Sequence, residues 1–234
     1  MQLFYDPNLQ PGLHQLRDVE ARHAFQVLRK RVGDTIDLVD GMGGWYKAAV
    51  TDISKRACFI EAREVRRESS RAMHRLHLYV APTKNIDRFE WILEKATELG
   101  VDFIQPIQTV HSERKRIRND RLERVLEAAM KQSLRAWLPR LGELLPLPEA
   151  LREASPDSRR FIAYLGADDT PLLHEEYVRG DSASIFIGPE GGFSPEEAKL
   201  VREQGGVYVS LGPNRLRTET AAIAAVHTIE QLNW

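Results

Sequence analysis

Two glycine-bearing segments near the end of the chain constrain its fold more than any other feature. The first covers residues 185–194 with the sequence IFIGPEGGFS, and the second covers residues 211–220 with the sequence LGPNRLRTET. Each begins as an apolar run and ends where a helix is predicted to start. Because open α/β sheets bind ligands beyond the carboxyl ends of their strands, two such junctions in one sheet predict a ligand-binding edge.

The composition is that of an ordinary globular protein. The chain has 234 residues, of which 42% are hydrophobic and 29% charged. It contains no apolar run of about 18 residues, the length typical of a membrane helix, and its start does not resemble a signal peptide. The single cysteine, Cys58, excludes an internal disulfide and a cysteine-cluster metal site, so we expect no metal and a cytoplasmic location. A buried structural thiol is favoured over a nucleophile, because Cys58 lies in a strand-like run.

The pattern of apolar residues changes character near residue 70. Residues 1–70 predict several short strands around glycine turns, with one helix over residues 18–31 that Gly33 ends, which together favour a small β-barrel. Residues 64–71 are polar and charged and are predicted to form a linker. Residues 74–234 alternate between strands and helices, which predicts a largely parallel sheet and an α/β fold.

The helices of the second part carry recognisable end signals. A helix over residues 88–99 is predicted to end at Gly100, and a longer one is predicted from Asn119 to about Arg135. Ser194 is followed by proline and two glutamates, which is the signature of a capped helix start. A last helix is predicted over residues 221–232.

Charge is unevenly distributed, although the net charge is only −1. Basic residues outnumber acidic ones up to about residue 140, and the balance then reverses. The densest basic run, residues 114–118, is followed by Arg121 and Arg124. It has two interpretations that the sequence leaves open: a solvated helix face paired with nearby acidic residues, or a patch that contacts phosphates.

The glycine loop at residues 188–192 does not match the common nucleotide motifs. It lacks the spacing of the dinucleotide fingerprint, and no Gly-Lys-Ser or Gly-Lys-Thr follows it. Glu190 also disfavours a phosphate at this turn, because like charges repel. Glycines allow close backbone approach, so the loop suits a flat or mildly cationic ligand, with backbone groups reading an adenine edge. The alternative is that both segments are tight turns without a ligand.

Taken together, these motifs resemble the RsmE family of 16S rRNA uracil-N3 methyltransferases, which belongs to the SPOUT class. The resemblance is carried by GPEGGFS at residues 188–194 and by LG and LRTETA at residues 211–221. Further similarity lies around His23 to Arg29, over residues 95–101 and over residues 127–135. It therefore covers nearly the whole chain. Lys115, Arg116, Leu134, Ala136 and Trp137 depart from the expected pattern and affect only the details of RNA contact.

The resemblance implies a fold, a cofactor and partners. The fold would be an N-terminal PUA-like β-barrel over residues 1–70 that binds RNA, and a SPOUT methyltransferase domain with a trefoil knot over residues 74–234. S-adenosyl-L-methionine would be the cofactor, the enzyme would be a homodimer, and its partner would be 16S rRNA in the small ribosomal subunit. The implied cofactor-binding residues are Leu165, Gly166, Gly188, Pro189, Glu190, Gly191, Gly192, Leu211, Gly212, Leu216, Arg217 and Thr218.

The reaction makes particular demands on the side chains. Neutral uracil carries a proton on N3, which must leave, or the anion must be stabilised, while the methyl donor lies in line. Arg217 is predicted to stabilise the anionic ring oxygens. Glu219 is predicted to orient Arg217 or to act as the base, but a carboxylate that merely favours a helix start remains an equal alternative.

Contact with RNA is predicted for ten basic residues from both parts of the chain. His23 is included because it either touches RNA or packs in the barrel. Phosphate contacts of this kind position a substrate without choosing its sequence. The predicted RNA-binding residues are Arg22, His23, Arg29, Lys30, Arg31, Lys84, Arg88, Arg114, Arg116 and Arg135.

Two other classes of function compete with the methyltransferase. A non-catalytic RNA-binding or ribosome-assembly protein could keep this fold, although an intact cofactor loop argues against it. A nicotinamide-dependent oxidoreductase is disfavoured by the missing fingerprint.

Overall fold

The computed structural model describes residues 2–54, 57–68, 74–166 and 169–234. The chain forms two compact units, and each is described by itself. The first contains residues 1–70 together with Glu127–Leu138, and the second contains Arg71–Leu126 and Pro139–Trp234. The domain boundaries predicted from the sequence, 1–70 and 74–234, place residues 127–138 in the second part instead.

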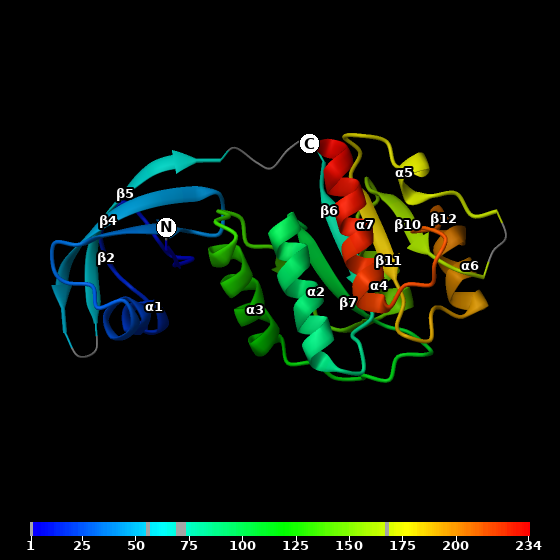
Figure 1. The fold of residues 1–234 in the computed structure, drawn as a ribbon, viewed down its shortest axis with the longest axis horizontal. Helices are drawn as coiled ribbons and strands as arrows, with labels where there is room; N and C mark the ends of the chain where they lie inside the picture. Colours follow the sequence, from blue (N-terminus) through cyan, green and yellow to red (C-terminus); the bar gives the residue numbers. More distant parts are fainter. Residues whose placement is uncertain (1, 55–56, 69–73, 167–168) are drawn as a thin grey trace. The chain divides into compact units, whose positions relative to one another are not determined.

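The first unit is built on a five-stranded sheet. Its strands are β1 (Leu3–Tyr5), β2 (Gly12–Gln15), β3 (Thr35–Val39), β4 (Gly44–Ile53) and β5 (Cys58–Arg67), shown in blue and cyan in Figure 1. The sheet order is β1-β3-β4-β5-β2, and every pairing is antiparallel except that of β1 with β3. Side chains of β4 alternate between buried and exposed over most of its length, which gives the sheet one apolar face. The core on that face includes Phe4, Leu38, Tyr46, Val50 and Ile60.

Two sequence expectations in this unit were wrong in detail. The helix predicted over residues 18–31 is a short α1 (Asp18–Arg22) followed by a π-helix, η1 (His23–Val27), and it ends well before Gly33. Arg29 turns the chain with a left-handed φ of 54°. The predicted linker at residues 64–71 is in part strand, because β5 continues to Arg67 by pairing with the start of β4. Residues 69–71 of that linker lie outside the described residues.

Residues 127–138 pack with the first unit through charge and apolar contacts. Arg17 pairs with Glu127 at 3.1 Å, and Lys131 pairs at 2.6 Å with Glu20, which is buried. Met130 joins an apolar cluster with residues of β1 and β3. These contacts join residues that are far apart in the sequence, so no local pattern marks them. For this reason the sequence pattern assigned the segment to the second part.

Burial of Cys58 confirms its interpretation as a structural thiol. The residue is fully buried, and burial raises the pKa of its thiol to about 11. Because the thiolate is the reactive form, we expect iodoacetamide to label Cys58 very slowly at pH 8 in the folded protein and rapidly in denaturant. Mass spectrometry of the alkylated peptide measures this, and equal labelling rates in both conditions would contradict the assignment.

The second unit contains the predicted parallel sheet. Its strands are β6 (Leu76–Val80), β7 (Phe103–Gln108), β8 (Arg140–Leu141), β9 (Leu145–Pro146), β10 (Arg159–Ala163), β11 (Ala183–Ile187) and β12 (Gly206–Val209). The order is β12-β10-β11-β6-β7-β8, with β9 also on β7, and all of these pairings are parallel. Every residue of β11 is buried, as expected for a strand covered on both faces. The trefoil knot stays a prediction.

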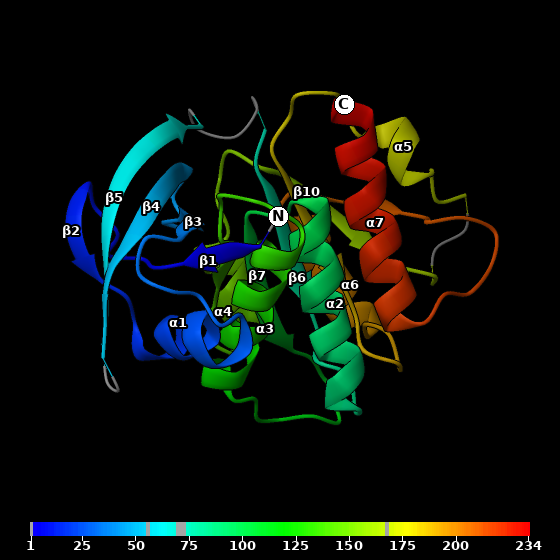
Figure 2. The ribbon, with the colours of Figure 1, turned by 60° about the vertical axis from the view of Figure 1, so that its left-hand side comes forward.

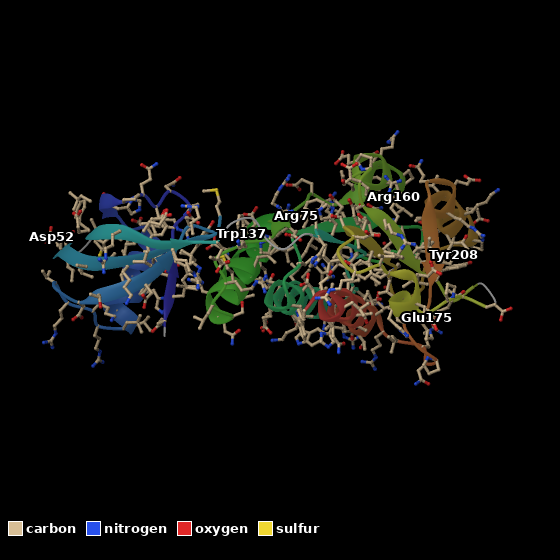
Figure 3. The ribbon with its side chains drawn as sticks, turned by 90° about the horizontal axis from the view of Figure 1, so that it is seen from above. Asp52, Arg75, Trp137, Arg160, Glu175 and Tyr208 are labelled. Atoms are coloured by element: carbon tan, nitrogen blue, oxygen red, sulfur yellow. The ribbon has the colours of Figure 1, made fainter. Side chains whose placement is uncertain are left out.

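Helices cover both faces of this sheet. On one face α2 (Ile86–Leu99) and α7 (Thr218–Asn233) lie side by side (Figure 2), and α5 (Leu173–Glu176) packs on α7. On the other face α4 (Leu147–Glu153) and α6 (Pro195–Glu203) contact each other and the sheet, and α6 lies opposite α7 in Figure 3. The remaining long helix, α3 (Asn119–Gln132), has residues in both units. No helix in the described part of the chain is long and apolar enough to cross a bilayer.

Two helix ends in the second unit follow the predicted signals. Two other predicted bounds were wrong, because α3 ends at Gln132 and not near Arg135, and α7 begins at Thr218 and not at residue 221. Gly100 ends α2 in the left-handed conformation, with φ at 113°. Ser194 and Glu197 form a reciprocal capping box at the start of α6, in which Ser194 Oγ accepts from the Glu197 N–H at 3.2 Å. Glu197 Oε2 in turn accepts from the Ser194 N–H, and its Oε1 accepts from the backbone N–H of Val110. This cap therefore also fixes the loop that follows β7.

Replacing Ser194 with alanine should therefore destabilise the protein. The orphaned helix N–H loses its acceptor, and we expect the free energy of unfolding to fall by about 1 kcal/mol. Urea unfolding of wild type and Ser194→Ala followed by circular dichroism measures the difference. A variant of unchanged stability would show that the box contributes nothing.

Candidate functional site

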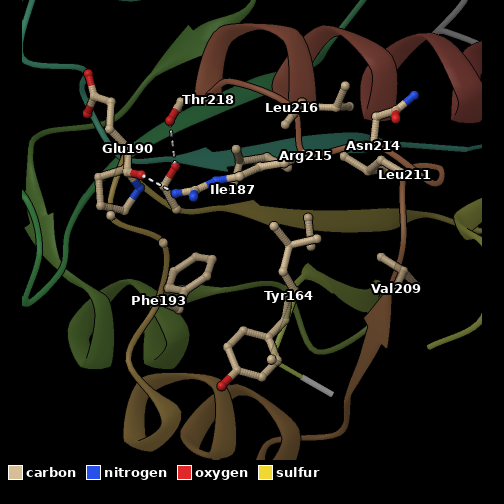
Figure 4. Close-up of a pocket in the computed structure, with 18 of the residues that line it drawn as sticks. Tyr164, Ile187, Glu190, Phe193, Val209, Leu211, Asn214, Arg215, Leu216 and Thr218 are labelled. Atoms are coloured by element: carbon tan, nitrogen blue, oxygen red, sulfur yellow. Dashed lines mark hydrogen bonds between the residues drawn. The ribbon is translucent and has the colours of Figure 1, made fainter. Parts of the chain in front are cut away.

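Three neighbouring strands end at one pocket. Strand β10 lies between β11 and β12, and the loops that follow these three strands enclose a cavity of about 410 Å³ (Figure 4). The pocket is therefore at the carboxyl edge of the sheet, where the sequence predicts a ligand site. The lining residues are Ala163, Tyr164, Leu165, Gly166, Ile187, Gly188, Pro189, Glu190, Gly191, Gly192, Phe193, Val209, Leu211, Gly212, Asn214, Arg215, Leu216, Thr218 and Ala221.

The predicted cofactor-binding residues are brought together by this arrangement. All of them line the pocket except Arg217, which lies between two lining residues and is exposed. Leu165 and Gly166, which follow β10, form the third wall.

Close backbone packing explains why the first loop needs its glycines. A Cβ on Gly188 would lie 3.1 Å from the backbone carbon of Gly192, and one on Gly191 would lie 2.9 Å from the Cβ of His111. In the second loop, Gly212 has a φ of 128°, which side-chain-bearing residues rarely adopt. A larger residue at Gly188 or Gly191 would force neighbouring atoms to shift, and one at Gly212 would strain the backbone.

Hydrogen bonds connect the two glycine loops. Thr218 Oγ1 donates to the carbonyl of Gly188 at 3.2 Å, and Arg215 Nη2 donates to the carbonyl of Glu190 at 3.5 Å, both drawn in Figure 4. The side chain of Ser210 accepts from the N–H of Gly212 at 3.2 Å. The pocket walls are thus held together by the protein's own contacts.

A further loop supports the pocket, and sequence reasoning missed it. The backbone N–H of Lys84, in the loop between β6 and α2, donates to the carboxylate of Glu190 at 3.0 Å. Arg114 donates to the carbonyls of Thr83 and Lys84 at 3.0 and 2.6 Å. The signal available in the sequence was the short segment between the predicted strand that ends at Val80 and the helix-capping residue Asn85.

His111 is a second residue that sequence reasoning missed. Its Nδ1 lies 3.1 Å from the carbonyl oxygen of Gly192, which can only accept, so Nδ1 carries the proton of this hydrogen bond. The side chain thereby packs against the glycine loop from outside. Its partner Gly192 lies far from it in the sequence, so no local pattern indicated this contact.

The two predicted catalytic residues occupy the start of α7. Arg217 is the residue that precedes the first turn, and its side chain is exposed. Glu219 lies in the first turn, with Oε1 3.6 Å from Nη1 of Arg88. Its Oε2 is buried and has no hydrogen-bond partner among the described residues. The structure does not record a contact between Arg217 and Glu219.

The predicted RNA-binding residues in the second unit differ in their exposure to solvent and in their partners within the protein. Lys84 is exposed and pairs with Glu113 at 2.8 Å, and Arg116 is exposed. Arg114 is half-buried and holds backbone carbonyls, whereas Arg88 reaches Glu219.

In the first unit, five predicted RNA-binding residues follow one another from α1 to the turn before β3. Arg22 and Lys30 each donate one hydrogen bond to a backbone carbonyl at 3.2 Å. Arg29 and Arg31 are exposed, and His23 is half-buried. Arg135 is the sixth predicted RNA-binding residue in this unit. It follows the end of α3, and its side chain is half-buried.

Within residues 2–54, 57–68, 74–166 and 169–234, no three His, Cys, Asp or Glu side chains gather in a way that could hold an ion.

Family models identify the class of protein to which this α/β fold and its pocket belong. Residues 70–230 match the family model described as the RNA methyltransferase domain, and residues 16–62 match the one described as the RNA methyltransferase PUA domain. The chain belongs to this family of PUA-bearing RNA methyltransferases, and the resemblance to RsmE is confirmed.

Curated relatives agree with this assignment over nearly their whole length. The chain is 29% identical over 230 residues to the ribosomal RNA small subunit methyltransferase E of Aquifex aeolicus, covering 97% of each chain. It is 27% identical over 222 residues to the protein of the same name from Bacillus subtilis, covering 90% of this chain and 86% of the relative.

Solved structures share the fold. A "probable rRNA-methyltransferase" from Porphyromonas gingivalis superposes with a TM-score of 0.90 at 37% identity, covering 100% of this chain and 98% of that one. The ribosomal RNA small subunit methyltransferase E of Neisseria gonorrhoeae, bound to S-adenosyl methionine, has a TM-score of 0.84 at 29% identity, covering 100% and 98%.

Proposed function

We propose that this chain transfers a methyl group from S-adenosyl-L-methionine to N3 of one uridine in the 16S rRNA of the small ribosomal subunit. The observation that carries the proposal is the pocket formed by the loops after β10, β11 and β12. Relatives named ribosomal RNA small subunit methyltransferase E, one of them solved with the methyl donor bound, support the same cofactor and substrate.

The residues present fit this cofactor. A volume of about 410 Å³ falls within the size range of small-molecule sites. Glycine backbone and apolar side chains suit a flat adenine, and the absence of a side chain at Gly188 and Gly191 keeps the loop compact. The eleven predicted residues that line the pocket would hold the cofactor, which supplies an electrophilic methyl group on a positively charged sulfur.

The chain's own residues then have distinct roles. The bound cofactor would supply the methyl group to uracil N3 and would leave as the neutral thioether, and the N3 proton must be removed. We assign proton acceptance to Glu219 Oε2, from which the proton passes to solvent, and stabilisation of the negatively charged ring oxygens to Arg217. Arg217 is exposed beside the pocket, which suits contact with the substrate rather than the cofactor.

RNA recognition would use both units. The target base must be unstacked to reach a donor held in a pocket. Residues 1–70 would bind RNA as a PUA-like domain, and residues 74–234 would carry out methyl transfer. The predicted basic residues other than Arg88, whose guanidinium faces Glu219, would position the phosphates, Arg114 through the loop it holds. The protein would act as a homodimer in the cytoplasm.

Methyl transfer to a defined nucleoside tests this function. The protein is incubated with isotopically labelled S-adenosyl-L-methionine and small ribosomal subunits that lack the modification, and the product is mapped by mass spectrometry. We expect N3-methyluridine at a single site. Folded protein without saturable cofactor binding in calorimetry would instead favour a non-catalytic RNA-binding protein, and methylation at another atom would contradict the uracil assignment.

A further inference from the structure

One ion pair at the edge of the site joins two helices that begin close together. Arg88 lies in the first turn of α2 and Glu219 in the first turn of α7. Their charged groups approach to 3.6 Å, and the side chains are 42% and 14% exposed, respectively. Arg88 therefore extends from solvent onto a carboxylate that is mostly buried.

This contact leaves the two oxygens of Glu219 in different environments. Oε1 faces the guanidinium of Arg88, whereas Oε2 is buried and lacks a hydrogen-bond partner among the described residues. A buried carboxylate oxygen without a hydrogen-bond donor is energetically unfavourable, so a donor is expected to reach it at some stage. Thr218 and Ala221, in the same turn of α7, line the pocket, whereas Glu219 is a chain neighbour of this lining and not part of it.

The start of α2 presents Arg88 from a fixed position. Asn85 caps the helix by accepting from the N–H of Asp87 at 3.0 Å. One turn further on, Arg121 donates to Glu90 at 2.9 Å, which ties α2 to the start of α3. The arginine thus projects from a turn that is held at both ends.

We propose that Arg88 is a positioning residue for methyl transfer. By engaging Oε1, it fixes the rotation of the Glu219 carboxylate and directs Oε2 to the N3 proton of the target base. This inference rests on the proposed function and on the role of Glu219 in it. It assigns Arg88 to the chemical step, in place of the phosphate contact predicted from its charge.

Lys84 offers a matched comparison within the same region. It precedes α2 by two residues, and its ammonium group pairs with Glu113 in an exposed ion pair with side chains 72% and 56% exposed. It has no contact with Glu219 that the structure records. A cation so exposed is suited to phosphate binding, which raises affinity and steepens the salt dependence.

Single-turnover kinetics of Arg88→Gln and Lys84→Gln on small ribosomal subunits separate the two roles. For Arg88→Gln we expect the rate of methyl transfer to fall by about 10- to 100-fold, with subunit affinity and its salt dependence unchanged. Arg88→Lys should recover part of the rate. Combining Arg88→Gln with Glu219→Gln should cost little beyond Glu219→Gln alone, because both act on one step. Lys84→Gln should weaken subunit binding and make its salt dependence shallower.

Several results would overturn the proposal. Weaker subunit binding, a shallower salt dependence and an unchanged saturated rate in Arg88→Gln would assign Arg88 to phosphate. An unchanged rate and affinity would remove it from both roles. If thermal melting shows that Arg88→Gln does not fold, Arg88→Met, which keeps the apolar stem, takes its place with the same criteria. The proposed function itself would be refuted if the wild-type protein transferred no methyl group. The results above all require an active wild-type protein, so the two kinds of failure can be told apart.

Discussion

Arg217→Ala is expected to lower the single-turnover rate of methyl transfer by about 10²- to 10³-fold, the usual cost of removing one group that stabilises developing negative charge. The cofactor affinity should stay within a few-fold of wild type. The physical reason is the position of Arg217, which is exposed immediately before α7 and outside the pocket lining. Rapid-quench assays with labelled cofactor measure the rate, and calorimetry measures the affinity.

Arg215→Ala is the matched control for this prediction. Arg215 lies two residues earlier, lines the pocket and donates to the carbonyl of Glu190. Its loss should weaken cofactor binding more than it slows transfer at saturating cofactor. Wild-type rates in Arg217→Ala would remove Arg217 from the mechanism, and a loss of cofactor affinity alone would return it to the cofactor site.

Gly212→Ala should sharply reduce cofactor binding. The φ of 128° at Gly212 is strained for alanine, at a cost of about 1–3 kcal/mol that the loop can avoid only by moving. Movement of this wall should raise the dissociation constant for S-adenosyl-L-methionine by about tenfold or more, since about 1.4 kcal/mol corresponds to a factor of ten. Calorimetric titration of the folded variant gives the constant.

Gly205→Ala distinguishes a local effect from a general loss of stability. Gly205 also has a positive φ, 82°, and it lies in the turn between α6 and β12, outside the pocket lining. We expect this variant to lose stability and to keep its cofactor affinity. Wild-type affinity in Gly212→Ala, or equal loss of affinity in both variants, would argue against the second glycine loop as a cofactor wall.

Sequence alone predicted the features that depend on local chemistry. The capping box at Ser194 and the helix stop at Gly100 are set by hydrogen bonds within a few residues, so their signatures are readable without a fold. The parallel sheet followed from alternating strands and helices. Because parallel strands end at one edge, the two glycine segments also predicted the pocket correctly.

Features that depend on distant partners could not be predicted in this way. The pairing of Arg88 with Glu219 and of Lys131 with Glu20 joins residues far apart in the chain. The sequence shows the charge of Arg88 but not the distant carboxylate that pairs with it. An RNA contact was therefore predicted for Arg88 from its charge alone. The turn at Arg29, where the first helix ends early, also carries no glycine to mark it.

The most direct test of the account is a crystal structure of this protein with S-adenosyl-L-methionine or S-adenosylhomocysteine. The account predicts ligand density within the pocket, between the loops that follow β10, β11 and β12, in contact with the backbone of residues 188–192 and 211–216. Density for the ligand at any other place on the molecule would contradict it, together with the roles assigned to Arg217 and Glu219.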